Sequence, residues 1–169
     1  MILLLILAYV ILSVIEIWIR NGMMPEQLGY IENDFQISQI KEHCLSTLAV
    51  SKKERIDALP FVVDEEKSKA LALSSFKAIG KTQILKEEEH YIHLLFTSRT
   101  FKLHTDIELY FDVVLNRIHM NFATRSLKNT IAFNKRYYQL IKRIYMKYFT
   151  VPSDVHQNTW NDVPGKKEE

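Results

Sequence analysis

Residues 91–136 read YIHLLFTSRTFKLHTDIELYFDVVLNRIHMNFATRSLKNTIAFNKR, and this stretch decides the fold. Apolar and polar residues alternate there in three successive runs, at 91–97, 106–112 and 117–124. Alternation with a period of two is typical of strands that bury one face. A short turn near Leu115 and Asn116 predicts an antiparallel hairpin from the last two runs. The stretch therefore predicts a sheet, followed through a polar loop at 126–130 by a covering helix.

The final helix carries an apolar stripe at steps of three and four, formed by Phe133, Tyr137, Leu140, Ile141, Ile144 and Tyr148. We expect this stripe to pack on the sheet. The other faces hold five basic residues and three large apolar ones, namely Lys135, Arg136, Lys142, Arg143, Lys147, Tyr138, Tyr145 and Met146. A basic amphipathic helix is able to dock on an anionic membrane, but a solvated face is the commoner meaning of such charges, and we adopt that interpretation.

Upstream of the sheet, the sequence predicts a short strand and a second helix. Residues 60–64, PFVVD, are the strand candidate. Asp64 is a good helix-capping residue, Gly80 stands where helices tend to end, and residues 65–79 between them carry a broad apolar face. The fold class is therefore α+β. We expect a two-layer sandwich in which two helices pack on a mainly antiparallel sheet.

A separate apolar run precedes the domain. Residues 2–19, ILLLILAYVILSVIEIWI, are apolar except for Ser13 and Glu16, and about 20 residues suffice to cross a bilayer. The run lacks a basic leader and a small-residue cleavage site, so we interpret it as a retained, single-pass transmembrane helix and not as a cleaved signal peptide. Glu16, Trp18 and Arg20 form a typical interfacial end, although contact of Glu16 with a partner helix is an alternative.

The composition fits one domain of ordinary size with an appendage. The chain has 169 residues, a net charge of +2 and a single cysteine, Cys44. This near balance of charge argues against nucleic acid as a partner, because phosphate binding needs a clustered excess of Lys and Arg. One cysteine excludes an intramolecular disulfide. We divide the chain into four parts: an anchor at 1–20, a connecting region with little regular structure at 21–59, an α+β domain at 60–150 and a flexible tail at 151–169.

Several short segments resemble a known family in their order and spacing. They are Asp106-Ile-Glu-Leu-Tyr-Phe-Asp112, Ile118-His119, Ala123-Thr124-Arg125 and Asn134-Lys-Arg136. Together they resemble the DUF1499 family, whose pattern reads roughly D-x-E-F-Y-F-D, I-x-V-R-S-A-S-R and N-R-x-R. Upstream matches add Leu28-Gly29, Cys44-Leu-Ser-Thr47, Arg55-Ile56 and Leu59-Pro60. The family is a domain of unknown function in membrane-anchored or exported bacterial proteins and plastid relatives, so the resemblance implies a fold and a location more than a reaction.

The chain also departs from that family pattern. The family cysteine that matches Cys44 usually has a second cysteine shortly before it, and here that region holds Ser38. The family loop after Arg125 carries glycines and an acid, where this chain has Leu127, Asn129-Thr130 and Ala132. Glycines allow backbone conformations that other residues avoid. We therefore expect any pocket that the family builds in this loop to be altered here.

Six polar residues are the candidate ligand-binding residues: Asp106, Glu108, His119, Arg125, Asn134 and Arg136. Glu108 and His119 occupy outward positions of adjacent predicted strands and could meet as an acid and base pair, or form an ordinary exposed pair. Arg125 and Asn134 flank the start of the last helix, where a carboxylate or phosphate could bind. Alternatively, Asn134 and Arg136 satisfy loop carbonyls or pair with Asp106. In both cases we favour the structural role.

No pattern of catalytic or metal-binding residues is recognisable. His90, His93, His104 and His119 are scattered without the spacing of a zinc site. Nucleophile motifs, phosphate-binding glycine loops and dinucleotide fingerprints are absent. We therefore expect no metal, no cofactor and no catalytic residue, and favour a protein that is not an enzyme.

These observations favour a membrane-anchored, non-enzymatic protein-interaction or structural module within an envelope or membrane-associated complex. Its expected partners are the lipid bilayer, through residues 2–19, and other proteins. The alternative is a domain that binds a small ligand or lipid, or hydrolyses one, with a site near the start of the last helix. Arg20 favours a cytoplasmic domain, whereas the family resemblance favours an extracytoplasmic one, periplasmic or lumenal. We follow the family, because one charge is a small bias.

Overall fold

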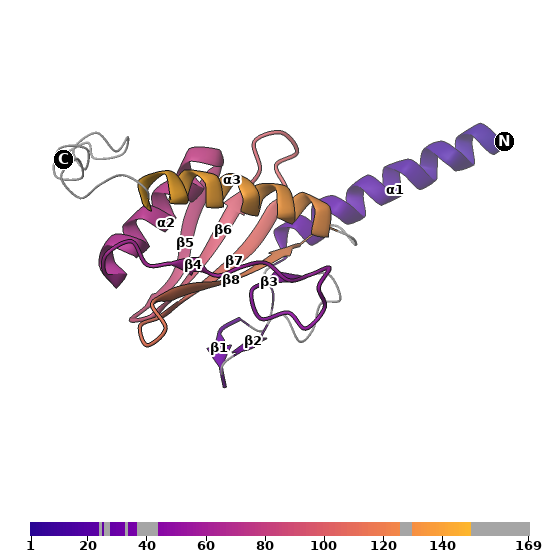
Figure 1. Ribbon diagram of the computed structural model, residues 1–169. Coiled ribbons are helices and arrows are strands. Elements are labelled where there is room, and N and C mark those ends of the chain that lie inside the picture. The colour runs from indigo at the N-terminus through magenta and orange to yellow at the C-terminus, as the bar shows by residue number, and fades with distance from the viewer. Residues whose placement is uncertain (24, 26–27, 33, 37–43, 126–129, 150–169) are drawn as a thin grey trace.

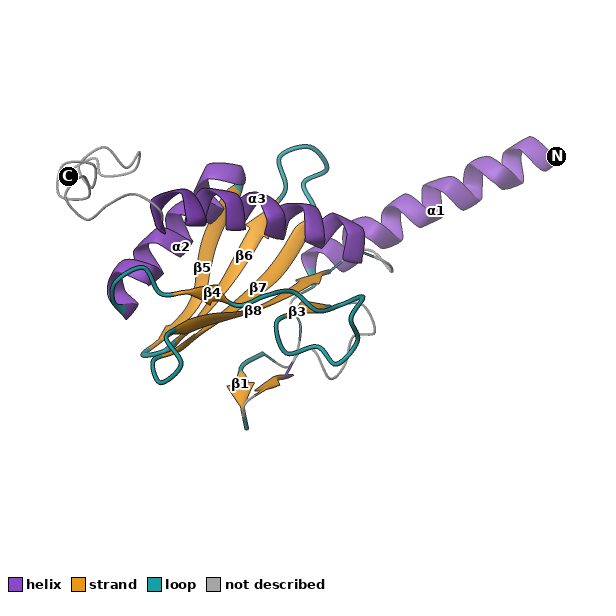
Figure 2. Cartoon of the chain, viewed as in Figure 1, coloured by secondary structure: helices purple, strands orange, loops and turns teal. Residues whose placement is uncertain are grey.

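The computed structural model describes residues 1–23, 25, 28–32, 34–36, 44–125 and 130–149. The predicted tail and most of the predicted polar loop lie outside these residues. The elements, in chain order, are α1 (Ile2–Gly22), β1 (Tyr30–Ile31), β2 (Asp34–Phe35), β3 (Leu45–Ser46), β4 (Leu59–Pro60), α2 (Glu65–Ile79), β5 (Lys81–Glu88), β6 (Tyr91–Thr97), β7 (His104–Asp112), β8 (Arg117–Thr124) and α3 (Ile131–Phe149). Figure 1 and Figure 2 show their arrangement.

The main sheet is antiparallel and has the strand order β3-β8-β7-β6-β5, with β4 also paired to β8. Helices α2 and α3 lie together on one face of it (Figure 1). The predicted α+β class with a helix layer on an antiparallel sheet is therefore confirmed. The three alternating runs of the sequence are β6, the greater part of β7, and β8.

Alternation places every second residue of each strand against the helices. The core between sheet and helices contains Ile92, Leu94 and Phe96 of β6, Ile107, Leu109 and Phe111 of β7, and Ile118, Met120 and Phe122 of β8. These side chains are at most 1% exposed. Burial on this scale is the main favourable term in folding, at about 25 cal/mol per Å² of apolar surface. The hydrophobic pattern thus sets both the strands and the register in which they pair.

Helix α2 begins and ends where the sequence predicts. The Asp64 carboxylate accepts a hydrogen bond from the Lys67 backbone N–H at 2.8 Å, which caps the first turn. Gly80 ends the helix with an extended backbone, so its conformation does not require glycine. Its surroundings do, because a Cβ at this position would lie 2.4 Å from the Phe96 ring and 2.9 Å from the Thr97 carbonyl oxygen.

The buried stripe of α3 differs from the predicted one. It consists of Ile131, Asn134, Tyr138, Ile141 and Tyr145. The expectation that the two tyrosines lie on other faces of the helix is wrong, since they are 1% and 0% exposed. Their hydroxyl groups donate to the backbone oxygens of Asp57, at 3.0 Å, and Pro60, at 2.8 Å. A satisfied hydroxyl lets a tyrosine pack like an apolar residue. Of the predicted stripe, Ile141 is buried and the other side chains are half-buried.

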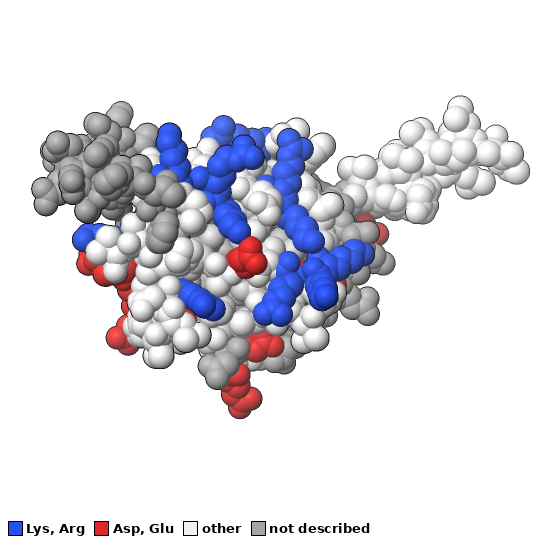
Figure 3. Space-filling model, in the orientation of Figure 1, with Lys and Arg blue, Asp and Glu red and all other residues white. Residues whose placement is uncertain are grey.

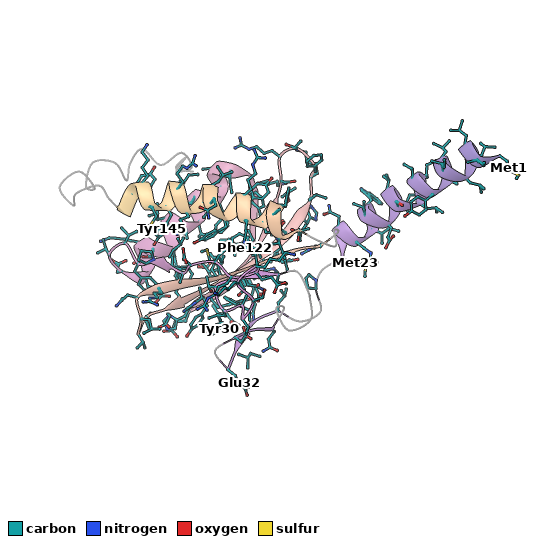
Figure 4. The ribbon with its side chains drawn as sticks, turned by 45° about the vertical axis from the view of Figure 1, so that its right-hand side comes forward. Met1, Met23, Tyr30, Glu32, Phe122 and Tyr145 are labelled. Carbon is teal, nitrogen blue, oxygen red and sulfur yellow. The ribbon has the colours of Figure 1, made fainter. Side chains whose placement is uncertain are left out.

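The segment expected to be a connecting region, residues 21–59, contributes to the sheet and covers its second face. Strand β3 pairs with β8, and the small β1–β2 hairpin lies on the side of the sheet away from the helices (Figure 1). Tyr30 stacks on Tyr110 with ring centroids 3.6 Å apart, and Phe35 is fully buried. Figure 4 shows Tyr30 and Tyr145 on opposite sides of the sheet. Both faces of the central strands are therefore covered.

Helix α1 extends away from the domain (Figure 1, Figure 4). It is long and apolar enough to cross a membrane, a test that a signal sequence also passes. The expected pair at its end is present, with Arg20 donating to Glu16 at 2.7 Å. No residue of α1 is buried in the domain.

Candidate functional site

One face of the central strands carries a row of polar side chains, opposite the helices. We name this row the polar cluster, and it consists of Tyr91 and His93 of β6, Asp106 and Glu108 of β7, and Asn121 of β8. All five residues are at most 4% exposed. Buried polar groups are costly unless they are paired. The contacts within the cluster therefore decide what it can do.

Asp106 lies at the centre of a buried ion pair. Its two carboxylate oxygens accept hydrogen bonds from Nε and Nη2 of Arg125, each at 2.7 Å, and one of them also lies 2.9 Å from Nε2 of His93. Burial alone would raise the pKa of Asp106, but the hydrogen bonds and charges of Arg125 and His93 outweigh it and hold the pKa below its ordinary value. The side chain of Arg125 is 6% exposed. This bidentate pair joins the end of β8 to β7.

Glu108 is fully buried and accepts three hydrogen bonds. The donors are the Tyr91 hydroxyl at 2.7 Å, the Asn121 amide at 2.9 Å and the backbone N–H of Gly29 at 2.9 Å. Burial raises the pKa of this carboxyl, and the three donors only partly offset it. Burial, together with the negative charge of Glu108, also raises the pKa of the Tyr91 hydroxyl.

The contact with Gly29 ties the covering segment to the sheet. Gly29 has a φ of 146°, a backbone conformation that other residues rarely adopt. The Asn121 Oδ1 atom is buried and has no hydrogen-bond partner among the described residues. The Tyr91 hydroxyl and the Asn121 amide nitrogen both donate to Glu108. The arrangement suits a cluster that fixes the N-terminal segment on the sheet.

A second polar group joins the first turn of α3 to the sheet. The hydroxyl of Thr124 donates to Oδ1 of Asn134 at 2.9 Å, and the Thr105 hydroxyl lies 3.0 Å from that of Thr124. The Asn134 amide also reaches the Thr130 hydroxyl at 3.3 Å. Asn134 is fully buried. Both the oxygen and the nitrogen of its side-chain amide are therefore hydrogen-bonded, and these bonds position the start of α3.

Glu108 and His119 form neither the possible acid and base pair nor the favoured exposed pair. Glu108 lies opposite Asn121 in the β7–β8 register, and His119 lies opposite Tyr110, two pairs further along. The expected exposure of Glu108 is also wrong, because the N-terminal segment covers that face. His119 is half-buried, with Nδ1 3.2 Å from the Thr47 hydroxyl and Nε2 3.8 Å from an Asp112 oxygen. Burial lowers its pKa, although Asp112 opposes the shift.

The DUF1499 family model, which describes a protein of unknown function, matches residues 34–143. The chain belongs to the DUF1499 family. Neither the curated proteins nor the solved structures contain a match. The DUF1499 match begins inside the segment expected to be a connecting region, in agreement with the pairing of β3 and β4 to the main sheet.

The structure divides the six candidate residues of this DUF1499 chain among different places. It brings Asp106 and Arg125 together with His93, and places Glu108 two residues further along β7 on the same face. Asn134 lies on the helix side of the sheet. Arg136 is exposed on α3 and takes no part in either cluster. The altered loop at 126–129 lies outside the described residues.

Sequence reasoning missed four participants: Gly29, Tyr91, His93 and Asn121. The signal for three of them is the alternation itself, because the polar positions of the three central strands fall on one face. Gly29 has no comparable signal. Among the described residues, no three His, Cys, Asp or Glu side chains come together as metal ligands.

Proposed function

We propose that this DUF1499 chain is a membrane-tethered, non-enzymatic module that binds another protein through the end of the domain farthest from α1. The observation that carries the proposal is the turn between β7 and β8, which we name the distal tip. Its residues Val113, Val114 and Leu115 are 44%, 84% and 57% exposed. Consecutive apolar side chains in water mark interaction sites more often than isolated ones do.

Hydrogen bonds order the backbone of the distal tip, which suits a binding surface. Oδ1 of Asp112 accepts hydrogen bonds from the backbone N–H groups of Val114, at 3.0 Å, and Leu115, at 2.8 Å. Asn116 follows with a left-handed backbone, at a φ of 51°, and its carbonyl accepts from the N–H of Phe61 at 3.0 Å. A turn that is ordered before binding loses little entropy when a partner docks.

The charge of the neighbouring surface indicates the kind of partner. Helix α3 contains five Lys and Arg residues and no acid. Arg136, Arg143 and Lys147 are exposed along its outer face, and Lys and Arg gather over this face in Figure 3. No described residue forms an ion pair with Arg136 or Arg143. Such a surface attracts acidic proteins and repels a second copy of itself.

Helix α3 runs from the side of the domain that adjoins α1 toward the side that carries the distal tip (Figure 1). The Tyr145 hydroxyl of α3 donates to the backbone oxygen of Pro60. The backbone N–H of the following residue, Phe61, donates to the carbonyl of Asn116 in the turn. We therefore infer a partner with an apolar pocket beside an acidic surface. The bilayer that holds α1 is a poor alternative, because the distal tip lies at the opposite end of the sheet from α1 (Figure 1).

The closed polar cluster supports a non-enzymatic role. The carboxylate of Asp106 is occupied by Arg125 and His93, and that of Glu108 by three donors. For the alternative, a ligand-binding or hydrolytic site near the start of α3, Arg125 would first have to release Asp106. Nothing in the geometry favours that exchange over the bidentate pair.

The proposal is tested by affinity capture of the tagged full chain from detergent-solubilised membranes. We expect a stoichiometric protein partner that is lost from V114D and weakened for R136E/R143E. The matched controls are V50D, since Val50 is 99% exposed on another loop, and K81E/K86E on the edge strand β5. Both controls should retain the partner. Equal capture by V114D and V50D would exclude the distal tip, and capture of no stoichiometric partner would refute the proposed function.

A further inference from the structure

The loop between β6 and β7, residues 98–103, presents one large apolar side chain to solvent. Phe101 is 71% exposed, and Lys102 beside it is exposed as well. Hydrogen bonds close the base of the loop, from the Ser98 N–H to the Leu103 carbonyl and from the Leu103 N–H to the Ser98 hydroxyl, each at 3.0 Å. Lys102 has a φ of 54°, a left-handed conformation that shapes the loop. The backbone that carries the exposed ring is thus ordered by hydrogen bonds.

The same loop is fastened to the end of the membrane helix. The Asn21 side chain donates to the Lys102 carbonyl at 3.0 Å and accepts from the His104 N–H at 2.6 Å. Nδ1 of His104 donates to the Asn21 carbonyl at 2.8 Å. Three hydrogen bonds to one residue fix the loop beside the C-terminal end of α1, and Figure 1 and Figure 4 show the two next to each other.

The length of α1 sets the depth of this contact. At about 1.5 Å per residue, a 21-residue helix is about 30 Å long, which matches the thickness of the hydrocarbon core of a bilayer. If α1 spans the membrane, Asn21 lies at the level of the lipid headgroups. Trp18, which is 79% exposed, marks the same boundary from α1. Phe101 directly precedes Lys102, whose carbonyl makes this contact, and consecutive Cα atoms are only about 3.8 Å apart.

We propose that residues 98–103 form a second membrane contact, in which Phe101 enters the boundary between headgroups and acyl chains and Lys102 faces lipid phosphate. The proposal rests on the membrane tether of the proposed function. An aromatic ring beside a base is the combination that favours this boundary. Arg99 donates to the Ala78 carbonyl at 3.0 Å and so holds the loop on α2. Two contacts fix the tilt of the domain, and the distal tip then points away from the bilayer.

The loop at 98–103 contacts lipid and not a protein partner, because it is level with the end of a helix that the bilayer surrounds. The distal tip provides the matched comparison. Val114 is similarly exposed, at 84%, and lies in a turn of comparable size at the opposite end of the sheet. Membrane insertion should therefore distinguish two loops that are equally accessible to water.

The test measures the depth of single tryptophans in the full chain. The natural tryptophans are Trp18 and Trp160. Three proteins are reconstituted into vesicles of phosphatidylcholine and phosphatidylglycerol: W160F, which retains Trp18, and F101W and V114W, each in a W18F/W160F background. Their fluorescence is then compared with and without phosphatidylcholine brominated near the start of its acyl chains.

We expect F101W to show a blue-shifted emission and a quench comparable to that of Trp18, while V114W remains unquenched. K102E added to F101W should reduce the quench in vesicles that contain phosphatidylglycerol. An F101W signal as unquenched as that of V114W, with Trp18 quenched, would overturn the second contact and leave the tether intact. An unquenched Trp18 would overturn the tether and this inference together. Circular dichroism of each variant checks that the domain is folded.

Discussion

At the scale of single residues, the most consequential interaction is the buried pair of Asp106 and Arg125. Both side chains are nearly inaccessible to water, and His93 adds a third hydrogen bond. Forming such a pair contributes little net free energy, because removing two charges from water offsets their attraction. Removing one partner is different, since the other charge then remains buried alone. The pair therefore matters more for fixing one arrangement of β7 and β8 than for adding stability.

Replacing Arg125 by methionine should destabilise the domain by about 3–5 kcal/mol, because it leaves the Asp106 carboxylate buried and without its main partner. Arg117→Met is the control, since Arg117 is exposed at the start of β8, the strand that Arg125 follows, and it should change the free energy of unfolding by less than about 0.5 kcal/mol. Urea unfolding in detergent, followed by near-ultraviolet circular dichroism, measures both. Similar losses in the two variants would show that the pair is not buried.

Glu108 should give the domain a distinctive pH dependence. Burial raises its pKa in the folded state, so the folded protein holds this proton at pH values where the unfolded chain, with a pKa of about 4.3, has released it. Its contribution to stability is therefore present below the unfolded pKa and is lost as the pH rises through the folded pKa. Asp106, whose pKa is lowered, acts in the opposite sense and loses its contribution as the pH falls.

The variant E108Q isolates this effect, because Asp106 is common to both proteins. We expect E108Q to gain stability relative to the natural chain as the pH rises from the ordinary glutamate range toward neutrality. Urea unfolding across that range measures the difference. The control is E66Q, a change at an exposed carboxyl of α2. Parallel curves for E108Q and the natural chain would contradict a raised pKa at Glu108.

At the scale of elements, the junction between α2 and β5 depends on the absence of a side chain. A Cβ on Gly80 would meet the Phe96 ring at 2.4 Å, and that ring is 1% exposed within the core. The Thr97 carbonyl on the other side is backbone and cannot move aside. Gly80→Ala should therefore destabilise the domain by about 1–3 kcal/mol, as overpacking does. Gly22→Ala, which meets nothing within 4 Å, is the control and should be nearly neutral in thermal unfolding. A neutral G80A would show that sheet and helix separate more easily here than their packing indicates.

The elements also show what the sequence could and could not predict. Strands β6 and β8 and helix α2 follow from alternation, capping and turn signals that act locally. The cover over the polar face is not local, because β1, β2 and β3 are each two residues long and carry no periodicity. Alternation alone predicts an exposed Glu108, because it carries no signal for this cover. It also gives no signal for the burial of Tyr138 and Tyr145, since their hydroxyl partners, Asp57 and Pro60, come from distant parts of the chain.

At the scale of the whole molecule, the two ends of the sheet have different surroundings. One end adjoins α1 through Asn21 and the loop at 98–103, and the other carries the distal tip. If α1 spans a membrane, the distal tip and the basic face of α3 lie in the same compartment. That compartment then determines which proteins the proposed interface reaches. The local charge at Arg20 and the family resemblance point to opposite sides, so the orientation of α1 is the property to measure.

We expect the domain to lie outside the cytoplasm. The positive-inside bias of Arg20 is one charge, Glu16 pairs with it at 2.7 Å, and long domains are translocated largely regardless of such a bias. C-terminal fusions in a bacterial host report the side directly: alkaline phosphatase should be active and a green fluorescent protein dark. Arg20→Glu should leave this pattern unchanged, whereas new lysines placed after Gly22 should shift it toward the cytoplasm. A fluorescent, phosphatase-inactive pair of fusions would contradict the orientation, and would place the proposed acidic partner of α3 in the cytoplasm.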